Sequence, residues 1–600
     1  MVHQKLFENF VNTHKLQLIS SGVPHHLWET LYRKVSKQIF DAGGTFCLLR
    51  IDYEDGNRGE FDAVWQLRVS NEQGIKANDS QQIYIVDHAW TFRMENAKQQ
   101  LYELHSLRSR LANLLNINQD QDTENLIEEI YKVMWKYCNY YSIANAESVE
   151  EQTPIWYIMD EVGSAIGHSD DPNFRMVPFF YIPDQMTYSV VFPVKDVDFE
   201  ETVTRNFVEV ECTEEERAAY LLPWQYTSFL EKDHSHKKLN ADYFLSGHVK
   251  ERIPSMYKSQ GAAFKKSSYK VYSEYNLINK YLTDPKFKIV DSENDADILW
   301  YTKHYKTFDE LAETPEKFIN QFPFEYVLTI KDLLCIVCRR KSDSTPDWLP
   351  VTYNLKIELV EFVSYFQKKE KAKLYNYWII KPFNLARGLD TYITNNINCI
   401  MRLATTGPKV AQQYIENPVL FFEHSVSGKV KFDIRYVLLL VSVKPLKVYA
   451  YKNFFLRFAN KPFELKNFED YSQHFTVMNY TDKGEIKHML CSDFKVEWEM
   501  QYADHPWVNV EKQIFKMFSE VFECAVMEEP PCGIASNPQS RALYAADVML
   551  EWAENEIHPK LLEINWMPDC KRACEYYKDF YNDIFNLLFF DVVDDVFQEL

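Results

Sequence analysis

Apolar residues near the amino terminus recur at the spacing of an α-helix. The stretches LFENFVNTHKLQLI and HHLWETLYRKVSKQIF, within residues 1–45, place large apolar side chains about every 3.6 positions. Residues 83–95 resemble a strand that leads into a helical stretch, and residues 124–143 repeat the helical spacing. This pattern predicts an N-terminal region that begins with helices.

The pattern changes after residue 152. Residues 153–212 contain short aromatic runs broken by Pro and Asp, such as WYIMDE and PFFYIP, which indicate short strands joined by turns. Residues 231–268 are polar and predict a linker between domains. Strands and helices then alternate to the end of the chain. We therefore expect an α+β multidomain protein with a β-rich N-terminal part.

The segment LLEINWMP, residues 561–568, places polar residues inside an apolar run. In a strand, Glu563 and Asn565 point to one face, and Leu562 and Ile564 to the other. A preceding run, ALYAADVMLEW, carries Asp547, and a turn near ENEIHPK would join the two runs into a hairpin. Asp547, Glu563 and Asn565 would then offer Mg²⁺ the oxygen ligands it prefers. The alternative is an ordinary half-exposed strand with one polar face.

Three further segments carry charged or polar residues on predicted strands. NYWIIKPFNLARGLDTYIT delivers Lys381 at a strand end, followed by a loop with Arg387 and Gly388. VAQQYIENPVLF follows, and GKVKFDIRYVLLL places Lys431, Asp433 and Arg435 on one strand face. A lysine on a strand beside a flexible loop suits a triphosphate. Charge alternation on a half-exposed strand is the simpler alternative for any one of these segments.

Composition and charge exclude several classes of protein. The chain has 600 residues, 46% of them hydrophobic and 15% aromatic, so it is neither disordered nor of low complexity. Its net charge of −21 argues against sequence-independent binding of nucleic acid. The longest apolar runs, such as YVLLLVSV, are too short to cross a bilayer, and the N-terminus lacks the pattern of a secretory signal. We expect a soluble intracellular protein.

The 11 cysteines are scattered, which indicates reduced thiols. Cys335 and Cys338 form a CxxC in an apolar run that resembles a strand, and Cys570 and Cys574 form a CxxxC. A zinc site that joins the two motifs is a disfavoured alternative, because zinc knuckles sit in polar turns.

The C-terminal motifs, taken in order, resemble the tubulin tyrosine ligase-like family, which has an ATP-grasp fold. The resemblance covers about residues 260–590 and rests on KPFNLARG, QQYI, KFDIRYVL, AADVML and LEIN. It implies that ATP and Mg²⁺ are cofactors and that tubulin is a partner. The family's reaction activates a carboxylate as an acyl phosphate, which an amine then attacks.

The same resemblance assigns roles to individual residues. The implied nucleotide-binding residues are Lys381, Arg387, Gln412, Gln413, Tyr414, Ile415 and Lys431. Arg435 would contact the γ-phosphate or the substrate carboxylate, and Asp547, Glu563 and Asn565 would hold Mg²⁺.

Two departures from the family pattern bear on catalysis. Family members usually read RGxG after the lysine, and here Asp390 replaces the second glycine. A carboxylate there would repel phosphate by about 1–4 kcal/mol at a surface-like dielectric. Gln413 also stands where the family usually has a basic residue. We therefore expect nucleotide binding without efficient ligation.

The N-terminal part resembles SET methyltransferases at two signatures. GSAIGHSDDPNF matches the first at His168, Ser169, Pro172 and Asn173, and PVKDVDFEETVTRNF resembles the second. Gly167 and Phe207 replace the expected Asn and Tyr, and Phe207 cannot form the hydrogen bond of the tyrosine hydroxyl. We expect a SET-like fold without its chemistry and without S-adenosylmethionine.

These observations give one organisation and three functional hypotheses. Residues 1–75 would be helical, 76–230 SET-like, 231–268 a linker and 269–600 the ATP-grasp region. The favoured hypothesis is a largely non-catalytic regulator of tubulin modification; the alternatives are an active amino-acid ligase and, less favoured, a lysine methyltransferase. Histone or chromatin factors are further conceivable partners of the SET-like region. We expect a cytoplasmic, cytoskeleton-associated protein, with a nuclear fraction left open.

Overall fold

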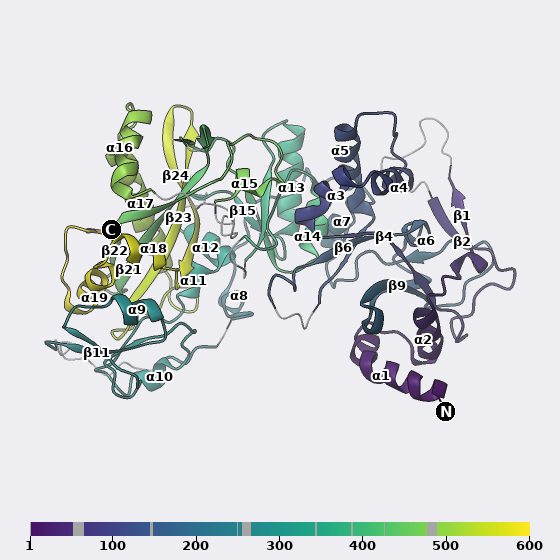
Figure 1. Cartoon of the computed structure of the whole chain (residues 1–600), viewed down its shortest axis with the longest axis horizontal. Helices are drawn as coiled ribbons and strands as arrows, with labels where there is room; N and C mark the ends of the chain where they lie inside the picture. Colours follow the sequence, from purple (N-terminus) through teal and green to yellow (C-terminus); the bar gives the residue numbers. More distant parts are fainter. Residues whose placement is uncertain are drawn as a thin grey trace. The chain divides into compact units, whose positions relative to one another are not determined.

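The chain forms two compact units, described here one at a time (Figure 1). The computed structural model describes residues 2–51, 65–143, 148–248, 250–254, 266–341, 345–383, 385, 388–424, 426–476 and 489–600. Unit 1 comprises Met1–His234, Leu359–Leu374 and Thr394–Gly407, and unit 2 comprises Ser235–Glu358, Tyr375–Ile393 and Pro408–Leu600. Unit 1 thus includes two segments from far along the sequence.

The first two helices of unit 1 pack on a small antiparallel sheet. The helices predicted within residues 1–45 are confirmed as α1 (Val2–Ser20) and α2 (Trp28–Lys37). Their buried side chains, such as Phe10 and Leu31, join a core with Ile85 and Val190 of the sheet. The sheet has the order β3-β9-β8, with strands Tyr84–Val86, Met186–Pro193 and Phe174–Tyr181.

A second antiparallel sheet of unit 1 lies among helices. Its order is β4-β6-β5, with strands His88–Phe92, Ile155–Met159 and Cys138–Tyr141. The helices are α3 (Ala97–Glu103), α4 (His105–Leu115), α5 (Thr123–Val133), α7 (Glu214–Tyr220), α13 (Leu359–Lys371) and α14 (Ile397–Ala404). The helical prediction for 124–143 is wrong beyond α5 and the short 3-10 turn Met134–Lys136, because residues Cys138–Tyr141 pair with β6. Aromatic residues favour such pairing over a helix.

Unit 2 contains three larger sheets, in agreement with the expected ATP-grasp region. The parallel sheet β12-β11-β13-β14 uses strands Phe287–Ile289, Tyr269–Ser273, Ile298–Trp300 and Phe318–Ile319. The sheet β15-β18-β16-β17 uses Thr352–Asn354, Lys409–Gln413, Trp378–Pro382 and Tyr392–Thr394. The sheet β24-β23-β21-β22-β25 uses Glu556–Trp566, Ala542–Ala553, Phe432–Ser442, Lys447–Phe458 and Phe597–Glu599.

Helices of unit 2 cover the five-stranded sheet. Helix α17 (Trp507–Ala525) and α16 (Cys491–Gln501) share a buried core with one face of the sheet. Helix α19 (Phe580–Phe590) and α18 (Lys571–Tyr576) share a core with β21 and β22. A hairpin of β19 (Phe421–Glu423) and β20 (Gly428–Val430) precedes β21. The sheet is therefore buried on both faces, which explains its long apolar strands.

The CxxC motif lies in a helix, so its assignment to a strand is wrong. Cys335 and Cys338 belong to α12 (Lys331–Cys338), where most side chains are buried in one core. A helix buried on nearly all sides has no polar stripe, so periodicity cannot distinguish it from a buried strand. All 11 cysteines are free thiols. No group of three or more His, Cys, Asp or Glu side chains among the described residues could hold a metal.

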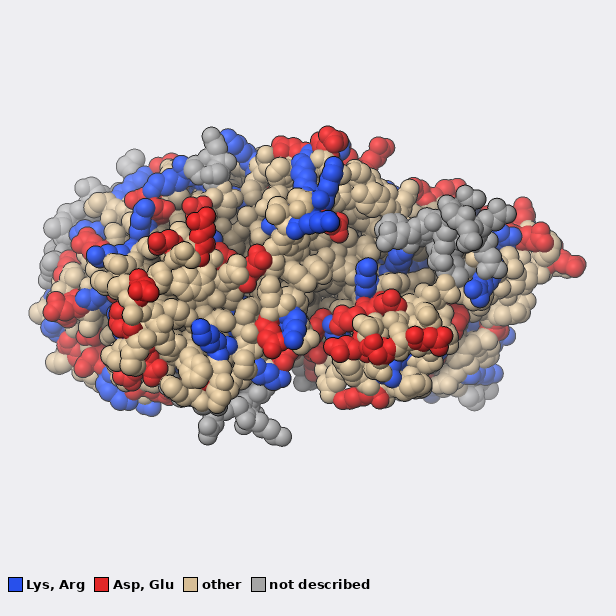
Figure 2. All heavy atoms as spheres, turned by 90° about the horizontal axis from the view of Figure 1, so that it is seen from above, with Lys and Arg blue, Asp and Glu red and all other residues tan. Residues whose placement is uncertain are grey.

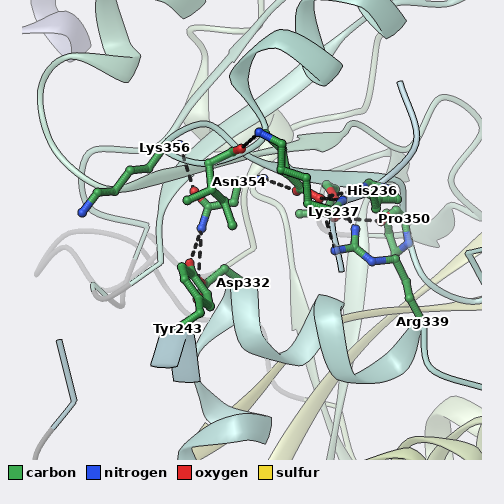
Figure 3. A network of polar contacts seen from close by, with 11 residues as sticks. His236, Lys237, Tyr243, Asp332, Arg339, Pro350, Asn354 and Lys356 are labelled. Atoms are coloured by element: carbon green, nitrogen blue, oxygen red, sulfur yellow. Dashed lines mark hydrogen bonds and ion pairs between the residues drawn. The ribbon is translucent and has the colours of Figure 1, made fainter. Parts of the chain in front are cut away.

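The boundary between the units, at His234, falls within the predicted linker 231–268, and the residues after it are anchored to unit 2. Figure 3 shows the polar network that anchors them. His236 Nδ1 lies 3.1 Å from Glu358 Oε1, and Tyr243 of α8 (Ala241–Leu245) donates to Asp332 Oδ2 at 2.6 Å. Asn354 Nδ2 donates to the Tyr243 hydroxyl at 2.7 Å. These bonds fix the entry of the chain into unit 2.

Charges of both signs cover the visible surface. Figure 2 shows acidic and basic side chains interspersed over one face of the described residues, rather than one continuous basic surface. Among the described helices, none is both long enough and apolar enough to cross a membrane.

Candidate functional site

The predicted hairpin brings Asp547, Glu563 and Asn565 together. Strands β23 and β24 pair antiparallel, with Asp547 opposite Glu563 and Ala545 opposite Asn565. Asn565 Nδ2 donates to Asp547 Oδ2 at 3.3 Å and to Glu563 Oε1 at 3.0 Å. Two carboxylates and one amide therefore meet on one face. With the Asn565 amide turned to present its oxygen, this donor set fits a hard divalent cation.

A bulge in the hairpin changes one predicted orientation. Asp547 pairs with Glu563, but the next residue, Val548, pairs with Leu561, so Leu562 is an extra residue in β24. Leu562 therefore lines the same cavity as Glu563 instead of pointing away from it. The strict alternation of side chains between the two faces fails here because the bulge adds one residue to β24.

Asp547 is held by two arginines on neighbouring strands. Arg435 Nε and Nη2 donate to its two oxygens at 2.7 and 2.8 Å, and Arg457 Nη2 lies 2.8 Å from Oδ2. Burial alone would raise the pKa of Asp547, but the guanidinium groups of Arg435 and Arg457 hold it below the usual range. In the structure these side chains supply the positive charge that a metal ion would otherwise provide.

Arg457 and Asp433 belong to the site, although neither was a predicted site residue. Arg457 Nε donates to Asp433 Oδ1 at 2.7 Å, and the Thr476 hydroxyl donates to Asp433 Oδ2. Both charged residues are buried, at 8% and 0% exposure, and they face each other across β21 and β22. The alternation of charged and apolar residues in KFDIR indicated that Asp433 lies on the same strand face as Lys431 and Arg435. The place of Arg457 in the site follows only from the register between β21 and β22.

A cavity of about 140 Å³ lies beside this cluster. Of the predicted nucleotide-binding residues, Lys381, Gln412, Gln413, Tyr414, Ile415 and Lys431 line it, and Asp433, Arg457, Asp547 and Glu563 complete one wall. Arg435 and Asn565 reach the cluster through Asp547. Arg387 lies outside the described residues. The cavity thus collects segments that lie far apart in the sequence, from Lys331 to Glu563.

Two lysines of the cavity have lowered pKa values. Lys381 Nζ donates to Gln412 Oε1 at 2.9 Å, and burial lowers the pKa of Lys381 to about 8. Lys431 Nζ donates to the Tyr414 hydroxyl at 2.7 Å, and burial lowers the pKa of Lys431 to about 7. An anionic ligand in the cavity would favour the charged form of both amines.

A third lysine, Lys331 of α12, also lines the cavity and was missed by sequence reasoning. Its Nζ lies 3.3 Å from Glu563 Oε2 and donates to the Leu385 carbonyl at 2.9 Å. Burial acts to raise the pKa of Glu563, but Lys331 and Lys381 hold it below its usual value. Lys331 thus connects Glu563 to the loop after Lys381.

Asp390 does not act as the sequence predicted. It adopts a positive φ of 51°, the backbone conformation that glycine adopts readily, and its carboxylate pairs with Lys409 Nζ. Both side chains are buried, at 5% and 1% exposure. The prediction that Asp390 repels phosphate is therefore wrong, because Lys409 on β18 neutralises its charge. The ion pair fastens the loop instead.

In unit 1, the two SET-like signatures meet. Strands β7 (Gly167–His168) and β10 (Thr204–Arg205) pair in parallel. Asn173 Nδ2 donates to the Thr202 carbonyl at 2.9 Å, its Oδ1 accepts from Thr204 N at 2.8 Å, and His168 Nδ1 accepts from Phe207 N at 3.2 Å. The matched polar residues therefore bond the backbone of the other signature. Phe207 places a ring, 5.2 Å from that of His168, at the position expected for a tyrosine.

Comparisons with known proteins follow this division of the chain. A model of the tubulin-tyrosine ligase family matches residues 310–598, and a model of the tubulin tyrosine ligase SET-like domain matches residues 57–228. Tubulin–tyrosine ligase-like protein 12 of Mus musculus is 40% identical over 622 residues, which cover 99% of this chain and 96% of the relative. The chain belongs to the tubulin–tyrosine ligase-like family.

Other members of the tubulin–tyrosine ligase-like family match over the whole chain or over part of it. The human protein 12 is 39% identical over 97% of this chain and 94% of its own length. Tubulin polyglutamylase TTLL5 of Mus musculus is 28% identical over 333 residues, which cover 51% of this chain and 23% of its own length. Family membership and the ATP-grasp-like fold are thus confirmed.

Proposed function

We propose that the protein binds Mg-ATP in the unit 2 cavity and binds tubulin as a regulator of its modification, with little ligation of its own. The named activity of a relative, tubulin polyglutamylase, supports tubulin as the partner. A cytoplasmic, cytoskeleton-associated location follows from that partner. The observation that carries the proposal is the buried Asp390–Lys409 pair beside an otherwise retained nucleotide site.

Nucleotide binding is supported by the side chains that line the cavity. Lys381 and Lys431 offer amines to phosphate oxygens, and the apolar part of the wall includes Ile379, Ile415 and Met549, which suit a base. Asp547, Glu563 and Asn565 would hold Mg²⁺ once the arginines release Asp547. Mg²⁺ held there would supply positive charge that neutralises the phosphates.

The loop between Lys381 and Asp390 supports the proposal of weak ligation. Phosphoryl transfer depends on positioning the phosphates, which a glycine-rich loop does by close backbone approach. Here Asp390, at the end of the loop, is held to β18 by its buried ion pair with Lys409. Gln413 also leaves the adjacent wall without the cation usual in the family.

An active amino-acid ligase is the second candidate, and a specific observation favours it. Asp547, Glu563 and Asn565 converge, and both cavity lysines are present, so the groups that activate a carboxylate are retained. The two candidates differ in turnover rather than in nucleotide binding.

The deciding experiment incubates the purified full chain with tubulin, ATP, Mg²⁺ and radiolabelled Tyr, Glu or Gly. We expect tubulin to co-elute with the wild type and with Glu563→Gln, and no label to enter tubulin. Glu528→Gln, a change at an exposed carboxylate outside the cavity lining, is the control. The protein would instead be a ligase if label enters tubulin with the wild type and with Glu528→Gln but not with Glu563→Gln.

Methyl transfer by unit 1 is disfavoured because Phe207 offers no hydroxyl and Gly167 no side chain. Calorimetry with S-adenosylmethionine should therefore show no heat of binding. A micromolar affinity would revive the methyltransferase hypothesis and, with it, a histone or chromatin partner for the SET-like region.

A further inference from the structure

Two arginines of unit 1, Arg402 buried and Arg205 partly exposed, lie where the SET-like signatures meet a helix from the ligase-like part of the chain. Arg205 ends β10, two residues before Phe207. Arg402 lies on α14, a helix within the residues that match the ligase family model. Both residues belong to unit 1, so the juxtaposition lies inside one compact body.

Neither guanidinium has an acidic partner among the residues that the structure describes. Arg205 Nη2 donates to Asn139 Oδ1 at 2.9 Å, and Arg402 Nη2 donates to the Cys138 carbonyl at 2.5 Å. The Nε atom of each arginine is buried without a hydrogen-bond partner. Arg435 and Arg457 of unit 2, by contrast, are matched by carboxylates.

The surroundings of the pair offer aromatic faces but little negative charge. Arg205 lies 4.7 Å from the Phe207 ring centroid, and Arg402 lies 4.9 Å from that of Trp224. Glu209 is the carboxylate whose charge reaches Arg205, and it is exposed to solvent. Burial lowers the pKa of Arg205 to about 10, and the charge of Arg402 lowers it further.

The neighbouring acidic residue Asp170 is already engaged. It pairs with Arg217, and it also lies 3.3 Å from His168 Nε2. A buried cation without a counterion is costly, so the buried Arg402, with the partly exposed Arg205 near it, calls for an anion. The planar guanidinium fork binds carboxylate and phosphate oxygens better than other anions.

We propose that Arg205 and Arg402 form a binding site for a small oxyanion, a phosphate or a carboxylate, at the junction of the two SET-like signatures. Access is through Arg205, which is partly exposed, while Arg402 is only 8% exposed and forms the floor. Phe207 and Trp224 cover the guanidinium faces, so a ligand would approach the edges of the guanidinium groups. This site does not depend on nucleotide binding in unit 2.

The test is calorimetric titration of the full chain with inorganic phosphate, glutamate and chloride at constant ionic strength. The Lys381→Met variant serves as the background, because phosphate could also enter the unit 2 cavity. We expect phosphate or glutamate to bind and chloride to give no heat. The stronger of the two identifies the ligand class.

Variants then locate the binding. Arg205→Gln and Arg402→Gln should each weaken binding at least tenfold, whereas Arg110→Gln, which removes an arginine from a surface ion pair of the same unit, should leave it unchanged. Arg205→Lys retains the positive charge but lacks the planar guanidinium group. It replaces the glutamine variant in the test if that variant fails to fold. Absence of binding to the Lys381→Met protein, or equal binding by the arginine variants, would overturn the proposal.

Discussion

The cavity of unit 2 and the paired signatures of unit 1 have each kept a different part of an enzyme site. In unit 2, the cluster of Asp547, Arg435 and Arg457 sets opposite charges against one another. In unit 1, Asn173 and His168 bond backbone atoms, while the hydroxyl-bearing residue is gone. Side chains that bond backbone preserve a fold, whereas matched charges facing a cavity preserve the capacity to bind a ligand. The contrast predicts that the two regions respond differently to substitution.

The largest effect is expected from Arg457→Leu. The substitution leaves Asp433 buried without its cation and removes one of the two arginines on Asp547, at a cost of about 3–5 kcal/mol in the free energy of unfolding. Urea denaturation of the full chain, followed by the transition of unit 2, measures it. Lys444→Met removes an exposed ion pair and should change stability by less than about 1 kcal/mol. Equal losses in the two variants would refute the importance of charge matching.

The next effect concerns the loop after Lys381. Asp390→Gly restores the glycine of the family but leaves Lys409 buried and unpaired, so we expect a loss of roughly 3 kcal/mol. The double variant Asp390→Gly with Lys409→Met should recover part of this loss, because it removes both charges. A double-mutant cycle from denaturation data gives the coupling. Additive effects of the two changes would show that the ion pair does not fasten the loop.

A smaller loss is expected in unit 1. Asn173→Ala removes the hydrogen bonds that join the two signatures and should cost about 1–3 kcal/mol, since it leaves buried backbone groups unpaired. ATP affinity should stay unchanged, because the cavity lies in unit 2. Asn118→Ala, in an exposed turn, provides the control. A fall in ATP affinity with Asn173→Ala alone would mean that the two regions are coupled.

The last expected effect is a pH dependence of nucleotide affinity. Burial gives Lys431 and Lys381 pKa values of about 7 and 8, so both amines lose their charge in the free protein as the pH rises from 7 to 9. Binding of phosphate then requires proton uptake, and affinity should fall with rising pH by at most about tenfold per unit for each amine. ATP titrations between pH 6.5 and 9 test this, and Lys431→Arg should flatten the curve. An affinity that rises with pH would contradict it.

Much of the cavity was predictable because its residues stand in motifs whose order and spacing are specific. Alternation in β21 and β24 placed Asp433, Arg435, Glu563 and Asn565, and the hairpin placed Asp547. Arg457 was missed because its role depends on register between β21 and β22, which the sequence of one strand does not reveal. The position of Leu562 was wrong because a single bulge shifted the pleat.

Two errors elsewhere have the same physical origin. The helix around Cys335 and Cys338 was taken for a strand because burial on nearly all sides removes the polar stripe that marks a helix. The charge of Asp390 was read as repulsive because its partner Lys409 lies 19 residues away. In both cases tertiary neighbours, rather than local sequence, determine the outcome.

The interleaving of the two units has a consequence for how the chain is made. Unit 1 closes only when helices α13 and α14 join it, and α14 is followed by Gly407, about 170 residues after His234. At ordinary rates of translation the nascent SET-like portion therefore waits on the order of ten to thirty seconds for its last pieces. During that interval the apolar surface that later packs against the two helices is exposed to water, which makes the nascent chain prone to aggregation.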